Sequence, residues 1–96
     1  MFFAATCLDK PDGLKTRMET RPAHLEHIAA HAKQIRVAGP LMKDDGETPK
    51  GSLLIIEAGS IEAAQAIVDA DPYTKADLFA SVTISPWKWL VGNPDE

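Results

Sequence analysis

The sequence has little of the chemistry that builds disulfide frameworks or metal clusters. Cys7 is its only cysteine, so neither an intrachain disulfide nor a zinc site made of several thiolates can form. Cysteine in an apolar stretch usually behaves as a small buried hydrophobe, and nothing near Cys7 in the sequence would lower its pKa. We therefore expect Cys7 to lie in the core as an unreactive thiol.

Long basic runs and long apolar runs are also missing. The formal net charge is -4 and the basic residues are scattered, so nothing marks a nucleic-acid or anionic membrane surface. No stretch approaches the roughly 18 apolar residues that a membrane-spanning helix needs. The first residues, MFFAATCLDKPDG, have neither the basic nor the apolar segment of a signal peptide. We expect a cytoplasmic protein that binds neither nucleic acid nor membrane.

The composition is that of a folded chain. Apolar residues make up 45% of the 96 residues and charged residues 25%, which is ordinary for a globular domain. A chain of this length has no room for two independent cores. We expect a single domain over residues 1–96.

Apolar periodicity and turn residues divide the chain into six elements. Short apolar runs bounded by turn residues predict strands at residues 2–8, 37–42, 52–58 and 78–91. Helical spacing predicts a main helix between the first two strands and a second helix after Ser60, which can cap it. Pro86 has no N–H to donate, so it places the last strand at a sheet edge or a bulge.

Pro22 governs the prediction for the main helix. Proline disfavours a helical conformation at the preceding residue and lacks an N–H, so Pro22 is best placed in the first turn. The segment Leu14–Glu19 then becomes a separate short turn or helix. The spacing predicts a buried face formed by Leu25, Ile28, Ala29, Ala32 and Ile35.

The order strand, helix, strand, strand, helix, strand predicts an α+β ferredoxin-like fold with both helices on one face of a four-stranded antiparallel sheet. The third strand is apolar on both faces, with Leu53 and Ile55 on one and Leu54 and Ile56 on the other. Two helices cover only one face. We therefore expect a homodimer in which a second subunit buries the open face.

Three histidines, the only ones in the chain, lie at helical spacing in RPAHLEHIAAHAK. His24 and His31 are two turns apart, about 10 Å along the axis, which is too far for one metal ion. His27 and His31 could bind as a pair, but no third ligand is evident in the sequence. We expect no metal, and a solvated or capping role for His27 and His31.

His24 is the best candidate for chemistry, as a general acid or base that needs a partner to fix its tautomer. Asp71 in DADPY could be that partner. It could equally be only the cap of a turn formed by residues 72–75. The two side chains can meet only if the loop after the second helix folds back across the first.

The segments RPAHLEHI, AGPL, DADPY and ADLF resemble those of the YCII-related family of small dimeric ferredoxin-like α+β proteins, over roughly residues 2–92. The resemblance implies a dimeric α+β barrel and a cleft with a His-Asp dyad, carried here by His24 and Asp71. It also implies cleft-lining roles for the matching residues, which are Arg21, Gly39, Pro40, Tyr73 and Phe79. His27 and His31 match nothing in that pattern.

The family is similar in fold to muconolactone isomerases and to dehalogenases of chlorinated muconolactones. The resemblance therefore implies proton transfer on a small organic acid or lactone by a lyase, isomerase, dehalogenase or hydrolase that needs no cofactor. In this hypothesis Arg21 holds a substrate carboxylate, and the backbone N–H of Gly39 helps bind an oxyanion. The alternative is a non-catalytic dimer that binds a metabolite or regulates a partner.

A third hypothesis, a haem-binding relative, has less support. Haem needs a proximal histidine in a large apolar pocket, and His31 is the only spare one. Trp87, Trp89 and Val91 alternate along the last predicted strand, so a buried strand face or an interface explains the two tryptophans better.

Overall fold

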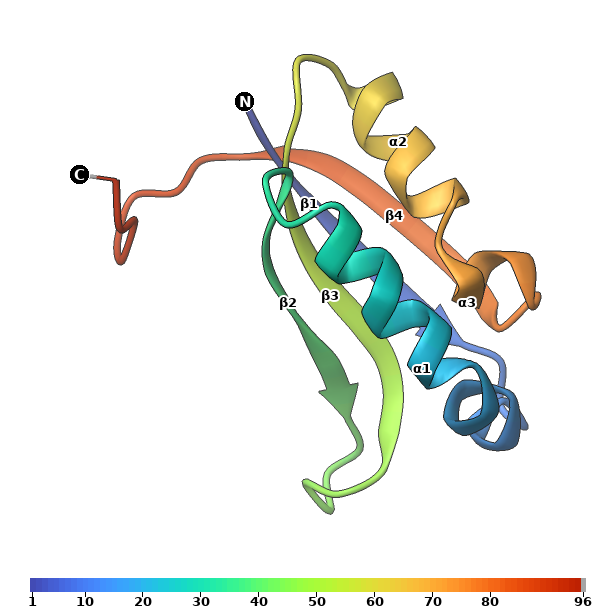
Figure 1. The fold of residues 1–96 in the computed structure, drawn as a ribbon. Helices are drawn as coiled ribbons and strands as arrows, with labels where there is room; N and C mark the ends of the chain where they lie inside the picture. Colours follow the sequence, from blue (N-terminus) through green and yellow to red (C-terminus); the bar gives the residue numbers. More distant parts are fainter. Residues whose placement is uncertain (96) are drawn as a thin grey trace.

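The computed structural model describes residues 1–95 and forms a four-stranded sheet with helices on one face (Figure 1). In chain order the elements are β1 Phe2–Asp9, α1 Leu14–Ala30, β2 Ile35–Met42, β3 Pro49–Glu57, α2 Ile61–Asp69, α3 Pro72–Lys75 and β4 Phe79–Trp87. The strand order is β2-β3-β1-β4, and every neighbouring pair is antiparallel. This confirms the α+β ferredoxin-like fold. The short helix α3 was not predicted as a separate element.

The core lies between the sheet and α2, where alternate residues of the central strands point toward the helices. It comprises Phe3, Ala5, Cys7, Ile35, Leu54, Ile56, Ala64 and Val68. Burial raises the pKa of the Cys7 thiol to about 12, which keeps it protonated and unreactive as expected. Ser60 accepts a hydrogen bond from the Ala63 N–H at 3.1 Å, which confirms the predicted cap of α2.

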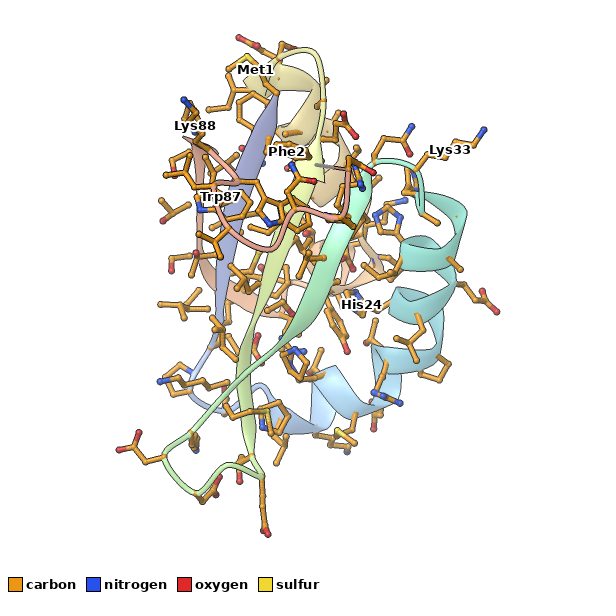
Figure 2. All side chains as sticks on the ribbon, turned by 90° about the vertical axis from the view of Figure 1, so that its left-hand side faces the viewer. Met1, Phe2, His24, Lys33, Trp87 and Lys88 are labelled. Carbon is orange, nitrogen blue, oxygen red and sulfur yellow. The ribbon has the colours of Figure 1, made fainter. Side chains whose placement is uncertain are left out.

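The prediction for α1 was wrong in two respects. The helix runs unbroken from Leu14 to Ala30 with Pro22 inside it, and it changes direction along its length (Figure 2). A proline ring removes one backbone hydrogen bond and crowds the preceding turn, which bends a helix without ending it when tertiary contacts hold both halves. His24 therefore lies in the middle of α1 and not in its first turn.

The expected apolar face of α1 is buried only in part, because Ile28 alone among its helical members packs against the core. Leu25 is 46% exposed, Ala29 and Ala32 are exposed, and Ile35 belongs to β2. The buried side chains of the helix are Arg17 and His24. The reason is that α1 packs chiefly against α3, and its side toward the sheet is occupied by a polar network and a cavity.

The last strand is shorter than predicted. It ends at Trp87, so Trp89 and Val91 lie beyond it and do not extend a buried strand face. Trp87 is 39% exposed and Val91 88% exposed. The position of Pro86 was predicted correctly, because β4 is an edge strand.

The sheet face opposite the helices is open and apolar, and it faces the viewer in Figure 2. Val37, Leu53 and Trp87 on this face are 36–42% exposed. The segment after β4 crosses one end of the face, where the Trp89 ring lies 5.5 Å from that of Phe2. Among the described residues no helix is long and apolar enough to cross a membrane.

Candidate active site

His24 and Asp71 meet between α1 and the start of α3. The Nδ1 atom of His24 lies 2.9 Å from both carboxylate oxygens of Asp71. Both side chains are largely buried, with 11% of His24 and 2% of Asp71 exposed. A carboxylate only accepts hydrogen bonds, so Nδ1 is the donor in this contact. In the neutral form of such an imidazole the lone pair is on Nε2.

The turn at Asp71 explains how residues 47 positions apart come together. Asp71 is the N-cap of α3, and its Oδ1 accepts a hydrogen bond from the Tyr73 N–H at 2.9 Å. Pro72 fixes the first position of this short helix, which folds back onto α1. The two roles considered for Asp71 are thus compatible: it caps the turn and contacts His24.

Tyr73 supports His24 from the side. Its ring stacks on the imidazole with 4.0 Å between centroids and 16° between planes. The Arg17 guanidinium lies over the same tyrosine ring, 4.5 Å from its centroid. Arg17 and His24 are two helical turns apart on α1, about 10 Å along its axis. Because both side chains contact the Tyr73 ring, the ring fills the space between them. Burial raises the pKa of Tyr73, which keeps the phenol neutral at physiological pH.

Arg17 is held by a buried ion pair. Its Nε and Nη2 atoms donate to the two oxygens of Asp9 at 2.6 and 2.9 Å, and each side chain is 5% exposed. Nη2 also donates to Ser52 Oγ at 2.9 Å. Arg17 and Ser52 were not predicted as site residues. A signal existed for Arg17, because it precedes His24 by seven residues and thus shares its helix face.

A cavity of about 190 Å³ opens beside His24, between α1 and the strands β2 and β3. Figure 2 shows His24 in the space between helix and sheet. The cavity is lined by Arg17, Arg21, His24, Leu25, Ile28, Ala38, Gly39, Pro40, Ser52, Leu54 and Tyr73. Arg21 is exposed and has no carboxylate partner among residues 1–95, whereas Arg17 is neutralised by Asp9. Arg21 is thus the cation available to an anionic ligand.

Comparison with known proteins places the chain in a family. Residues 1–88 match the YCII-related domain. The chain belongs to the YCII-related family. It is 38% identical over 95 residues to the protein YciI of Escherichia coli O6:H1, covering 92% of this chain and 97% of that protein. An uncharacterized protein of Haemophilus influenzae is 30% identical over 95 residues, with the same coverage.

Solved structures agree with this YCII-related fold. The 5-chloro-2-hydroxyhydroquinone dehydrochlorinase TftG of Burkholderia phenoliruptrix, in complex with 2,5-dihydroxybenzoquinone, has a TM-score of 0.84 and 35% identity. The match covers 92% of this chain and 94% of that one. Protein Atu4242 of Agrobacterium tumefaciens, at 15% identity and a TM-score of 0.56 over 98% of each chain, shares the fold. An enzyme that binds a small molecule thus has this fold.

Four of the five residues matched to the family's cleft line the cavity, namely Arg21, Gly39, Pro40 and Tyr73. Phe79 is not among the residues that line this cavity. Its ring packs edge-on against that of Tyr73 at 6.1 Å between centroids, on the side of the core. Phe79 faces the helices from β4, at the sheet edge remote from β2, so it supports Tyr73 from behind.

The other two histidines of this YCII-related chain bind backbone carbonyls. His27 Nε2 donates to Ile67 O at 3.0 Å, which joins α1 to α2. His31, the C-cap residue of α1, donates from Nδ1 to His27 O at 2.9 Å. These contacts agree with the expected capping roles. Within residues 1–95 no three His, Cys, Asp or Glu side chains are grouped to hold a metal ion.

Burial lowers the pKa of His27, and this effect is larger than the opposing effect of the nearby Asp71 carboxylate. The His27 imidazole therefore binds a proton more readily in the unfolded chain than in the folded one. The stability that His27 contributes is complete above its unfolded pKa of about 6.5 and is lost as the pH falls below it. We expect the free energy of unfolding to fall between about pH 7 and 5, and less steeply in His27→Gln. Urea denaturation at several pH values measures both slopes, and equal slopes would contradict the prediction.

Proposed function

We propose that this protein is a cofactor-independent enzyme in which His24 transfers a proton of a small organic acid, lactone or related cyclic substrate. The observation that carries the proposal is the contact between His24 Nδ1 and Asp71, 2.9 Å to each oxygen, which leaves Nε2 free on a residue that lines a cavity. A neutral imidazole with its tautomer fixed by a carboxylate is the usual form of a histidine base.

In the proposed reaction His24 Nε2 accepts a proton from the substrate, and Asp71 stabilises the resulting imidazolium. An isomerase would return this proton to another atom of the same molecule. A dehalogenating lyase would expel chloride as the proton leaves, so the product has one hydrogen and one chlorine fewer and one more double bond. Arg21 binds the acidic group of the substrate through its planar fork.

Similarity to TftG favours the elimination reaction. We expect the wild-type protein to release chloride and protons in equal amounts from 5-chloro-2-hydroxyhydroquinone under anaerobic conditions. A chloride electrode and a pH-stat measure the two products. Binding without turnover of this compound, and of lactones tested in parallel, would favour the metabolite-binding alternative.

We propose further that the protein is a homodimer through its open sheet face. Support comes from the exposed apolar side chains there, because a lone domain rarely leaves a whole sheet face uncovered. Sedimentation velocity should give twice the chain mass. Leu53→Lys should dissociate the dimer, since it places a charge in the apolar interface.

Ile61→Lys is the matched control for the dimer experiment. Ile61 is 40% exposed, close to the 36% of Leu53, but it lies at the start of α2 on the helical side. This variant should sediment like the wild type. A monomeric wild-type protein, or a Leu53→Lys variant that remains dimeric, would contradict the open face as the interface.

A further inference from the structure

Ser52 is a buried hydroxyl with an unused donor. It lies on the helix-facing side of β3, is 3% exposed and lines the cavity that contains His24. Its Oγ accepts a hydrogen bond from Arg17 Nη2 at 2.9 Å. A hydroxyl can also donate one hydrogen bond, and among the described residues no acceptor takes it. The O–H is therefore available to a molecule in the cavity.

Arg17 makes this hydroxyl a better donor. Its Nε and Nη2 hydrogens are taken by Asp9 and Ser52, which fixes the guanidinium plane. A cationic donor on the serine oxygen polarises its O–H bond, and this strengthens the hydrogen bond that the hydroxyl gives to the next acceptor. Arg17 also lines the cavity.

The backbone holds Ser52 in a fixed position. Ser52 pairs with Cys7 of β1 and with Pro40 of β2, so both neighbouring strands flank it. The preceding Gly51 approaches the backbone oxygen of Cys7 so closely that any Cβ would clash. A side chain there would force β3 away from β1. The glycine thus keeps the hydroxyl in place beside the cavity.

We infer that Ser52, supported by Arg17, binds an oxygen atom of the substrate in the cavity that His24 also lines. The substrates that this site fits have a carbonyl, enol or phenol oxygen that binds Ser52. That oxygen is conjugated with the atom, carbon or oxygen, from which His24 removes the proton. When His24 removes that proton, negative charge develops on the conjugated oxygen, where a fixed donor stabilises it. Which substrate atom loses its proton rests on the proposed function. The binding of a substrate oxygen by Ser52, called the oxygen site below, does not rest on it.

The test uses 4-nitrocatechol, a planar probe with two adjacent oxygens whose visible absorbance changes with ionisation and hydrogen bonding. We expect the wild-type protein to bind it, and Ser52→Ala to weaken binding by about ten- to hundredfold, the effect of losing a hydrogen bond to a charged oxygen. Ser52→Thr retains the hydroxyl on a strand that favours β-branched residues, and should bind within about threefold of the wild type. Circular dichroism checks that each variant folds.

Ser85→Ala is the matched control, because Ser85 lies on the opposite face of the sheet in β4. It should bind the probe like the wild type. Equal binding by Ser52→Ala and the wild type overturns the inference, as does a wild-type protein that leaves the probe spectrum unchanged at millimolar concentration.

The oxygen site and the proposed function can fail separately. Turnover that depends on His24 but is unchanged in Ser52→Ala overturns the oxygen site and leaves the enzyme proposal standing. Weaker probe binding by Ser52→Ala, together with no turnover by the wild type, supports the oxygen site and removes the enzyme proposal.

Discussion

Replacing His24 by glutamine is expected to lower the turnover number by about a hundredfold to ten-thousandfold, the usual contribution of a positioned general base. Glutamine can still donate a hydrogen bond to Asp71, but its amide cannot accept a proton at neutral pH. The cavity and the neighbouring Arg21 remain, so substrate binding should change little. Initial rates over a range of substrate concentrations separate the two effects.

Two further variants make this test specific. Asp71→Asn keeps a side-chain oxygen to cap α3 through the Tyr73 N–H, but it removes the negative charge that fixes the His24 tautomer. We expect a large loss of turnover with little loss of stability. Nitrogen NMR shifts of the imidazole should show that the proton is no longer confined to Nδ1.

His31→Gln is the matched histidine control, because His31 lies near the end of α1, where it binds a backbone carbonyl and packs against the His27 ring, and it does not line the cavity. It should retain wild-type turnover. If His24→Gln and His31→Gln had equal rates, His24 would not be the base and the proposed mechanism would be wrong.

Replacing Arg17 by methionine is expected to lower the free energy of unfolding by about 3–5 kcal/mol, the usual effect of removing one partner of a buried ion pair. The change leaves the Asp9 carboxylate, 5% exposed, without either of its two charged hydrogen bonds. It also removes the cation that lies over the Tyr73 ring. Equilibrium urea denaturation measures the loss.

The double variant Arg17→Met with Asp9→Leu shows whether the cost comes from the unpaired charge. Apolar replacement of a whole buried pair is often nearly neutral, so the double variant should recover much of the stability. Arg21→Met is the exposed control and should change stability by less than about 0.5 kcal/mol, because Arg21 has no ion pair among the described residues. A loss in Arg17→Met no greater than in Arg21→Met would show that the pair contributes nothing.

The sequence by itself determined the sheet and its two faces. Side chains alternate between the two faces of a strand, which predicted that Leu54 and Ile56 share one face and Leu53 and Ile55 the other. The pairing with β1 shows that Leu54 and Ile56 face the helices and that Leu53 and Ile55 lie on the open face. The missing N–H of Pro86 located an edge strand. These features follow from local backbone chemistry and from side-chain alternation, so neighbouring residues are enough to predict them.

Only the tertiary structure decided how α1 is built and what it buries. Local rules divided the helix at Pro22, but contacts with α3 and the sheet stabilise both halves, so it continues with a bend. An apolar stripe was expected to face the core. The most deeply buried side chains of the helix are instead Arg17 and His24, because each has a carboxylate partner. Asp71 could be named from the sequence as a candidate partner of His24, but nothing there paired Arg17 with Asp9.

The candidate site was likewise decided in three dimensions. His24 could be selected from the sequence for its chemistry, but its contact with Asp71 spans 47 positions and depends on α3 folding back. The contact of Arg17 with Ser52 spans 35 positions, and nothing in the sequence distinguishes this serine from the others. Which side chains meet at the site is determined by the packing of elements that are far apart in the sequence, because only packing fixes the distances between their side chains.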